Sequence, residues 1–225
     1  MIDRDLLIER IDAAIAEDFV GALDVTTAAT IPANQRCIAE FRTRKAGVVS
    51  GIDVAIVVID RVCTSGYEIL SRISDGNQVG PDVTVLKVAA RTREMLVAER
   101  TALNFLSRLS GIATAANTWV AAISGTNAKI RDTRKTTPGW RDLEKYAVLC
   151  GGGVNHRLNL AESALLKDNH IAAVGGITAA VAAIKNHFPG ILIEVEIDGL
   201  DQLEEAISAG VEEVLLDNMT PEQCR

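Results

Sequence analysis

The sequence predicts an α/β protein whose two halves are organised differently. In the first half, strand-like and helix-like segments follow one another in no regular order. From residue 127 onward, short apolar segments alternate with helices, which is typical of βαβ units and a parallel sheet. The 225 residues are 48% hydrophobic and 24% charged, which indicates a globular chain with a core of its own. We place the boundary between the halves near residues 105–125.

The elements of the first half are predicted from apolar periodicity and turn residues. Apolar side chains recur at helical spacing over residues 4–18 and form a continuous run over 52–62, so a helix is expected at each place. Strand character is found over 36–49, 67–72 and 83–89. A long helix then runs from about residue 91 to 109. Arg100 lies at the edge of its apolar arc, close in angle to Leu96 and Leu103, where it can reach an adjoining surface.

The second half is expected to be a run of strands and helices in alternation. The apolar segments 128–132, 164–167, 191–197 and 211–217 are predicted as strands. Between them, helices are predicted over 141–150, 177–187 and 200–209. Such alternation favours a parallel sheet whose strands all end at the same edge.

Composition excludes several classes of protein. Lys and Arg total 23 against 30 Asp and Glu, so the net charge is −7 and the chain is a poor general binder of nucleic acid or anionic membrane. The four cysteines form no C-x-x-C motif, and we expect reduced thiols in a cytoplasmic protein. No apolar run near residue 1 resembles a signal peptide, and the uncharged stretch 109–128 is too interrupted by polar residues for a membrane span.

Charged residues gather where the predicted strands end. In chain order they are Arg134 and Lys135, Lys167 and Asp168, Glu194 and Glu196, and Asp217 with Asn218. Active sites of βα barrels assemble at the C-terminal ends of the strands, because the βα loops open there. Charges also flank buried strands merely to mark their ends, but four strands in succession favour a site.

Cationic residues occur in two clusters. Arg134 and Lys135 lie in a loop that Pro138 and Gly139 interrupt, where they suit a carboxylate or phosphate, although a solvated basic turn is the simpler reading. The second cluster, His156 and Arg157, follows the three glycines 151–153. The glycines either let the backbone approach a ligand or form a flexible joint, and a single His is more often structural than catalytic.

Lys167, Glu196 and Asp217 have several possible roles. Lys167 is a candidate for a Schiff base, for a phosphate contact, or for an ion pair with Asp168 or a carboxylate of the neighbouring strand. Glu194 and Glu196 share one face of their strand and, with Asp217, suit Mg²⁺ held through water and substrate phosphates, or a developing positive charge. Salt bridges to Lys135 or Lys167 are compatible with either role.

These motifs also carry a family resemblance that covers nearly the whole chain. The sequence resembles quinolinate phosphoribosyltransferases in ERTALNFL (99–106), SGIAT (110–114), DTRKTTPG (132–139), GGVNHR (152–157), LKDNH (166–170), EVE (194–196) and LLDN (215–218). The segments Glu17-Asp18 and DVTT (24–27) resemble the opening of that family. DTRKTTPG alone is highly specific.

The resemblance implies a fold and a domain organisation. It implies an N-terminal α/β sandwich-like domain with a long connecting helix over 1–110, and an incomplete (open) TIM-like α/β barrel over 111–225. Further strands and a phosphate-binding Ser-Gly-Gly segment are expected beyond Arg225, so the barrel is expected to be truncated at its C-terminus. The resemblance also implies a homodimer, or a higher oligomer, in which the N-terminal domain of one subunit covers the barrel mouth of the other.

The resemblance further implies the role of each site residue. The two carboxylates of quinolinate would be held by four residues of one subunit, Arg134, Lys135, His156 and Arg157, and by Arg100 of the other. Lys167, Glu196 and Asp217 would face phosphoribosyl pyrophosphate and its Mg²⁺ cofactor, which Glu196 and Asp217 hold indirectly. The groups expected to be catalytic are Lys135, Glu196 and Asp217.

The expected reaction is that of a pentosyltransferase in de novo NAD biosynthesis. Quinolinate and phosphoribosyl pyrophosphate would give nicotinate mononucleotide, pyrophosphate and CO₂. Three alternatives stay open: a Schiff-base aldolase using Lys167, a related pyrophosphorylase with another acceptor, and a non-catalytic paralogue that binds an anionic metabolite. No nucleic acid or membrane partner is expected.

Overall fold

The computed structural model describes residues 2–19 and 23–225. The chain forms two compact units, Met1–His156 and Arg157–Arg225. Each unit has its own hydrophobic core. The predicted division into domains near residue 110 lies within one continuous helix, α4 (Thr92–Ala122), and stays a prediction.

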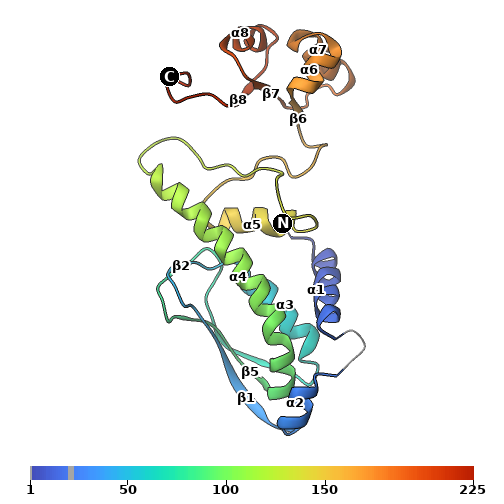
Figure 1. Cartoon of the computed structure of the whole chain (residues 1–225), viewed down its shortest axis with the longest axis vertical. Coiled ribbons are helices and arrows are strands. Elements are labelled where there is room, and N and C mark those ends of the chain that lie inside the picture. The colour runs from blue at the N-terminus through green and yellow to red at the C-terminus, as the bar shows by residue number, and fades with distance from the viewer. Residues whose placement is uncertain (1, 20–22) are drawn as a thin grey trace. The chain divides into compact units, whose positions relative to one another are not determined.

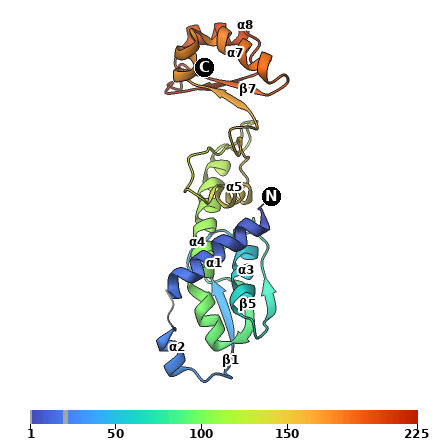
Figure 2. The ribbon, with the colours of Figure 1, turned by 90° about the vertical axis from the view of Figure 1, so that its right-hand side faces the viewer.

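The first unit combines antiparallel sheets with helices (Figure 1). Its elements before α4 are α1 (Arg4–Phe19), α2 (Val25–Thr30), β1 (Arg36–Arg42), β2 (Gly47–Val48), α3 (Ile52–Val62), β3 (Glu68–Arg72), β4 (Gln78–Val79) and β5 (Thr84–Arg91). Strand β5 lies between β1 and β3, and β2 pairs with β4. Figure 2 shows α1 lying across α3 and α4.

Helix α3 has the bounds that its apolar run predicts. Ile52, Val54, Ala55 and Val58 are buried against the core that α4 shares. Its N-terminus is capped from a distance, because the carboxylate of Asp75 accepts hydrogen bonds from the backbone N–H groups of Gly51 and Ile52, each at 2.9 Å.

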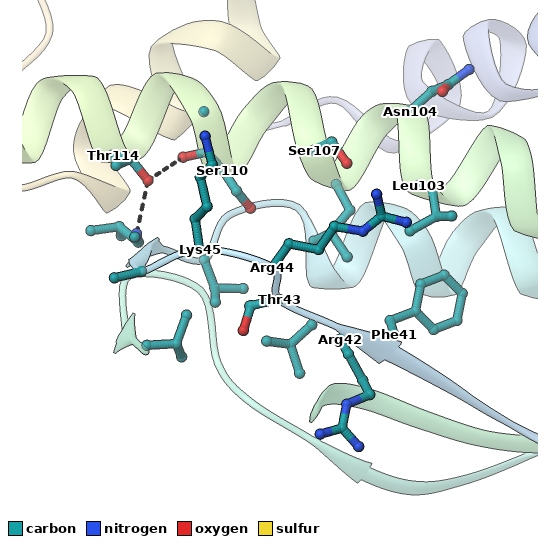
Figure 3. Close-up of a pocket in the computed structure, with 18 of the residues that line it drawn as sticks. Phe41, Arg42, Thr43, Arg44, Lys45, Leu103, Asn104, Ser107, Ser110 and Thr114 are labelled. Carbon is teal, nitrogen blue, oxygen red and sulfur yellow. Dashed lines mark hydrogen bonds between the residues drawn. The ribbon is translucent and has the colours of Figure 1, made fainter. Parts of the chain in front are cut away.

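Helix α4 runs 13 residues past its predicted end at residue 109. Ser110 and Thr114 interrupt the apolar pattern there, but both hydroxyls are satisfied. Thr114 Oγ1 donates to the Ser110 carbonyl at 2.7 Å and accepts from Val48 N at 2.9 Å, as Figure 3 shows. Ser110 Oγ accepts from Ser50 N at 3.0 Å. Hydroxyls that bond to the preceding turn are compatible with a helix interior, so these residues continue the helix.

The last part of the first unit holds a loop and α5 (Arg141–Cys150). The strand predicted over 128–132 is wrong. It is reduced to one parallel bridge between Arg131 and Val154. The helix predicted over 141–150 is confirmed, and α5 lies against α4.

The second unit is built on a three-stranded parallel sheet. Its elements are β6 (Ala164–Leu166), α6 (Asp168–Val174), α7 (Ile177–His187), β7 (Ile193–Ile197), α8 (Leu200–Ser208) and β8 (Glu213–Leu216). Strand β7 lies between β6 and β8, and all pairings are parallel, as the alternation predicts. Helices α7 and α8 lie over the sheet (Figure 2). Ile177, Ala180 and Val181 of α7 and Ala206 of α8 are buried in the core that they share with it. The sheet is open, which confirms the prediction of an open α/β architecture.

No helix in the described ranges 2–19 and 23–225 has the length and apolar character needed to cross a bilayer.

Candidate functional site

The loop 132–139 carries the first predicted cations and starts from a buried acid. Asp132 forms an ion pair with Lys145 of α5, and the exposed fractions of the two side chains are 7% and 2%. Asp132 Oδ1 also accepts from His156 N at 2.8 Å, and Lys145 Nζ donates to the His156 carbonyl at 2.8 Å. With its amide nitrogen facing these acceptors, Asn155 donates to Asp132 Oδ2 at 2.7 Å. Asp132 therefore ties the loop to the segment that carries His156.

Arg134 and Lys135 follow this anchor. Lys135 is exposed, and Arg134 is half-buried. Within the described residues, Arg134 Nε is shielded from solvent and has no hydrogen-bond partner. An unsatisfied buried donor costs about 1–3 kcal/mol, and a carboxylate or phosphate would satisfy a guanidinium with two parallel hydrogen bonds. The loop thus has the chemistry of an anion site.

The three glycines are needed for close packing and for a turn. A Cβ on Gly151 would lie 2.3 Å from the Ala113 carbonyl oxygen of α4, and one on Gly153 would lie 2.7 Å from Val148 Cγ1. Gly152 has φ +88°, which an L side chain rarely adopts. The glycines therefore seat the turn against α4 and α5, which argues against a flexible joint.

In the second unit, three predicted site residues lie at the carboxyl edge of the parallel sheet. Lys167 follows β6, Glu196 lies on β7 and Asp217 follows β8. Lys167 Nζ and Glu196 Oε2 are 3.2 Å apart, and Asp217 N donates to the Ile197 carbonyl at 3.0 Å. Lys167 thus makes the ion pair to a neighbouring strand that was the alternative to a Schiff base.

The other residues of this unit differ in their surroundings. Glu194 shares a face of β7 with Glu196 but is buried, so it is less accessible to a ligand. Arg157 begins the second unit and donates from Nη1 to the Ser163 carbonyl at 2.7 Å. The Nδ2 of Asn218 donates to Asp217 Oδ2 at 2.8 Å.

Arg100 lies elsewhere in the first unit. It lines a pocket of about 660 Å³ between α4 and the segment from β1 to β2. Figure 3 shows this pocket, with Arg42, Arg44 and Lys45 among the labelled lining residues. Arg42, Arg44 and Lys45 also line this pocket, so it is strongly basic. Among the lining residues that the structure describes, none comes from the loop 132–139. Arg100 is therefore not part of the loop site of its own unit.

The structure also brings in two residues that the sequence did not single out. Glu144 and Lys145 are buried charges in α5, and both contact the loop 132–139. Charged side chains are almost never fully buried unless they are paired. The sequence does not show burial, so both residues look like ordinary charges on a helix surface.

Metal ligands are few. No cluster of three or more His, Cys, Asp or Glu side chains suited to a metal ion occurs in the part of the chain that the structure describes. Glu196 lies on β7 and Asp217 follows the neighbouring strand β8, so the two carboxylates lie at one edge of the sheet. Two carboxylates fit Mg²⁺ bound mostly by water and substrate phosphates, the usual manner of this ion.

The mixed α/β fold, the cationic loop 132–139 and the charged edge of the parallel sheet are the features of an α/β enzyme that acts on anionic substrates. Family models of the N-terminal and C-terminal domains of quinolinate phosphoribosyl transferase match residues 24–110 and 112–225. The chain therefore belongs to the quinolinate phosphoribosyltransferase family.

Individual relatives agree with this assignment. The chain is 47% identical over 211 residues to the nicotinate-nucleotide pyrophosphorylase [carboxylating] of Mycobacterium leprae. The matched region covers 93% of this chain and 74% of that relative. A probable enzyme of the same name from Bacillus subtilis is 37% identical, with 92% and 71% covered. Two solved structures each superpose with a TM-score of 0.94 at 37% identity. They are NadC from Streptococcus pyogenes, where the match covers 100% of this chain and 79% of that one, and the nicotinate-nucleotide pyrophosphorylase from Francisella tularensis, where it covers 99% and 78%.

Proposed function

We propose that this chain transfers the phosphoribosyl group of phosphoribosyl pyrophosphate to quinolinate with decarboxylation, as a pentosyltransferase of de novo NAD biosynthesis. The pyridine nitrogen attacks the anomeric carbon of ribose as the bond to pyrophosphate breaks. The quaternised ring then accepts the electron pair released when the adjacent carboxylate leaves as CO₂, and that ring carbon takes up a proton. The products are nicotinate mononucleotide, pyrophosphate and CO₂.

The observation that carries this proposal is the unsatisfied, shielded Nε of Arg134 in the anchored loop. Quinolinate has two carboxylates, and the loop supplies Arg134 and Lys135 as partners for them. We assign His156 and Arg157 to the same carboxylates. Cations fixed before binding orient the ring nitrogen for attack, which lowers the entropic part of the activation barrier.

The sheet edge of the second unit is assigned to the phosphoribosyl half. Lys167 suits the phosphate groups, and the carboxylates of Glu196 and Asp217 suit the ribose hydroxyls and the positive charge that develops on the ribosyl centre. Lys135, Glu196 and Asp217 are the proposed catalytic residues. Glu196 and Asp217 would hold Mg²⁺ indirectly, and when bound this ion supplies positive charge that neutralises the leaving pyrophosphate.

We also propose a homodimer or higher oligomer with shared active sites, in which Arg100 reaches the quinolinate bound by its partner. The basic pocket around Arg100 supports this arrangement, because its described lining contains no residue of the loop 132–139. The four free cysteines support a reducing, cytoplasmic setting.

Calorimetric titration with quinolinate, beside an assay for nicotinate mononucleotide with phosphoribosyl pyrophosphate and Mg²⁺, tests the proposal. Arg134→Ala should weaken quinolinate binding by about 2–5 kcal/mol, as for a removed partner of a buried charge pair, or at least about thirtyfold. Arg61→Ala is the matched control, because Arg61 is 45% exposed and pairs with Asp12 on the surface. Unchanged affinity in Arg134→Ala would overturn the clamp. Binding without turnover would instead indicate the non-catalytic paralogue, and no binding would indicate another acceptor.

A further inference from the structure

We propose that Glu144 and Lys145 of α5 are positioning residues for the quinolinate site, and that they hold the two ends of the loop 132–137 so that it presents Arg134 and Lys135 in one conformation. The inference rests on the proposed function, since it concerns the same carboxylate-binding loop. It adds two residues that would not touch the substrate.

Lys145 holds the first end of the loop. Its side chain is 2% exposed, and its ammonium contacts both Asp132 and the His156 carbonyl. Because Asp132 also accepts from His156 N, the one buried pair fixes the start of the loop and the segment that carries His156. A buried ion pair is weak evidence for net stability, but removal of one partner leaves an uncompensated charge and disrupts its surroundings.

Glu144 holds the second end. Its Oε2 accepts from Thr137 N at 3.2 Å, and its Oε1 accepts from Arg108 Nη2 at 2.7 Å. The same Arg108 nitrogen donates to Thr137 Oγ1 at 2.7 Å, so Thr137 is bound through its backbone and its side chain. The residue before it is held as well, since Arg141 Nε donates to Thr136 Oγ1 at 3.2 Å.

Between these anchors the loop has little freedom. Lys135 N donates to Thr133 Oγ1 at 3.0 Å, and Thr136 N donates to the Arg134 carbonyl at 3.0 Å. Glu144 and Lys145 are neighbours on α5, so both ends of the loop are held by the same helix. The loop backbone at Arg134 and Lys135 is therefore ordered on folding, and a bound carboxylate need not order it.

Quinolinate titration of Glu144 variants tests the second anchor. Glu144→Ala should weaken quinolinate binding at least tenfold, and Glu144→Gln, which keeps one acceptor oxygen, should fall between Glu144→Ala and the unmodified chain. The matched control is Asp142→Ala on the same helix. Asp142 pairs with Arg10 at 2.7 Å, with side chains 18% and 17% exposed, and is equally structural but bonds to α1 instead of the loop. It should lower the thermal midpoint yet leave quinolinate affinity within about twofold, the scatter of distant sites.

The first anchor needs a variant that leaves no buried charge unpaired. The double variant Asp132→Asn/Lys145→Met removes both charges together, so the fold is retained. It should also lose at least tenfold in quinolinate affinity. Undiminished affinity in this folded double variant would overturn the role of Lys145.

A double-mutant cycle separates positioning from general destabilisation. If Glu144 acts through Arg134, then Arg134→Ala/Glu144→Ala should bind quinolinate no more than about threefold more weakly than Arg134→Ala alone. Fully additive losses would overturn the proposal. The proposal would also be overturned if Glu144→Ala bound quinolinate as tightly as Asp142→Ala while Arg134→Ala bound it weakly. In that case the clamp formed by Arg134 would still be supported. An Arg134→Ala variant with unchanged affinity would instead refute the proposed function.

Discussion

Lys167 directly follows β6, Glu196 lies on the neighbouring parallel strand β7, and their charged atoms are 3.2 Å apart at the carboxyl edge of the second unit's sheet. The Lys167 side chain is 45% exposed and that of Glu196 is 17% exposed. Exposed and half-exposed ion pairs contribute about 0–1 kcal/mol to stability. The pair therefore contributes little to the stability of the fold, and its place at the sheet edge is compatible with the role in substrate binding proposed above.

Glu196→Gln should separate the two halves of the proposed reaction. We expect nicotinate mononucleotide formation to fall about 10²–10³-fold, as when one preorganised electrostatic group is lost, while quinolinate affinity stays within about twofold. The free energy of unfolding should change by less than about 1 kcal/mol. Glu204→Gln, on the exposed side of α8, is the control and should leave both readouts unchanged. Normal turnover in Glu196→Gln would refute its catalytic role.

Gly151→Ala should destabilise the first unit. The added Cβ would meet the Ala113 carbonyl oxygen at 2.3 Å and the Ala116 Cβ at 2.7 Å, and neither is the end of a flexible side chain. Overpacking of this kind costs about 1–3 kcal/mol, which urea unfolding measures. Gly80→Ala, whose Cβ would meet nothing within 4 Å, should change stability by no more than about 0.5 kcal/mol. Equal stabilities of the two variants would show that α4 yields easily at this contact.

The loop should weaken in acid through Glu144. Burial raises the pKa of this carboxyl, but hydrogen bonds from Arg108 and Thr137 outweigh burial and hold the pKa below its ordinary value of 4.5. A lowered folded-state pKa gives stability that is present above the unfolded-state value and is lost as pH falls through the folded-state value.

Urea unfolding at a series of pH values tests this sign. The unmodified chain should exceed Glu144→Gln in stability at neutral pH, and the difference should shrink as pH falls below 4.5. A difference that grows in acid would mean that folding raises the pKa of Glu144 instead of lowering it.

Cys63 should be unreactive until the first unit opens. The Cys63 side chain is buried in the core of that unit, and burial raises its pKa to about 11. Because the thiolate is the reactive form, a thiol reagent at neutral pH should modify exposed Cys224 first. Mass spectrometry of the labelled peptides measures both rates. Cys224→Ser should remove the fast phase, and rapid labelling of Cys63 in native buffer would contradict its buried position.

Helices with clear punctuation were predictable from the sequence. The expected ranges 52–62, 141–150 and 177–187 are the observed bounds of α3, α5 and α7. A glycine borders each of them, and apolar periodicity defines the rest. Helix α6 was not predicted, because its first residues look like a charged strand end. Its start depends on His170 Nδ1, which accepts from Lys167 N at 3.1 Å, a contact that no apolar pattern contains.

The candidate site was predictable where topology alone decides position. Lys167, Glu196 and Asp217 meet at one edge because parallel strands end together. Glu144 and Lys145 were not predictable, because α5 has no solvated face to compare with a buried one. Leu149 is the one exposed residue of this fully described helix. A pattern of polar and apolar residues cannot reveal which charges turn inward when nearly every position is covered.

Helix α4 gives the chain a fixed spacing between two cations of different purpose. Arg100 lines the basic pocket, and Arg108 binds Glu144 and Thr137 two turns further along. Eight residues of helix set them about 12 Å apart. One residue inserted between them would rotate the rest of α4 by about 100° relative to Arg100, so Arg100 and Arg108 could not both keep their present surroundings. The number of residues between Arg100 and Arg108 is therefore constrained by the contacts of both side chains as well as by packing. In a homologous protein, this segment should differ by substitutions and not by insertions or deletions.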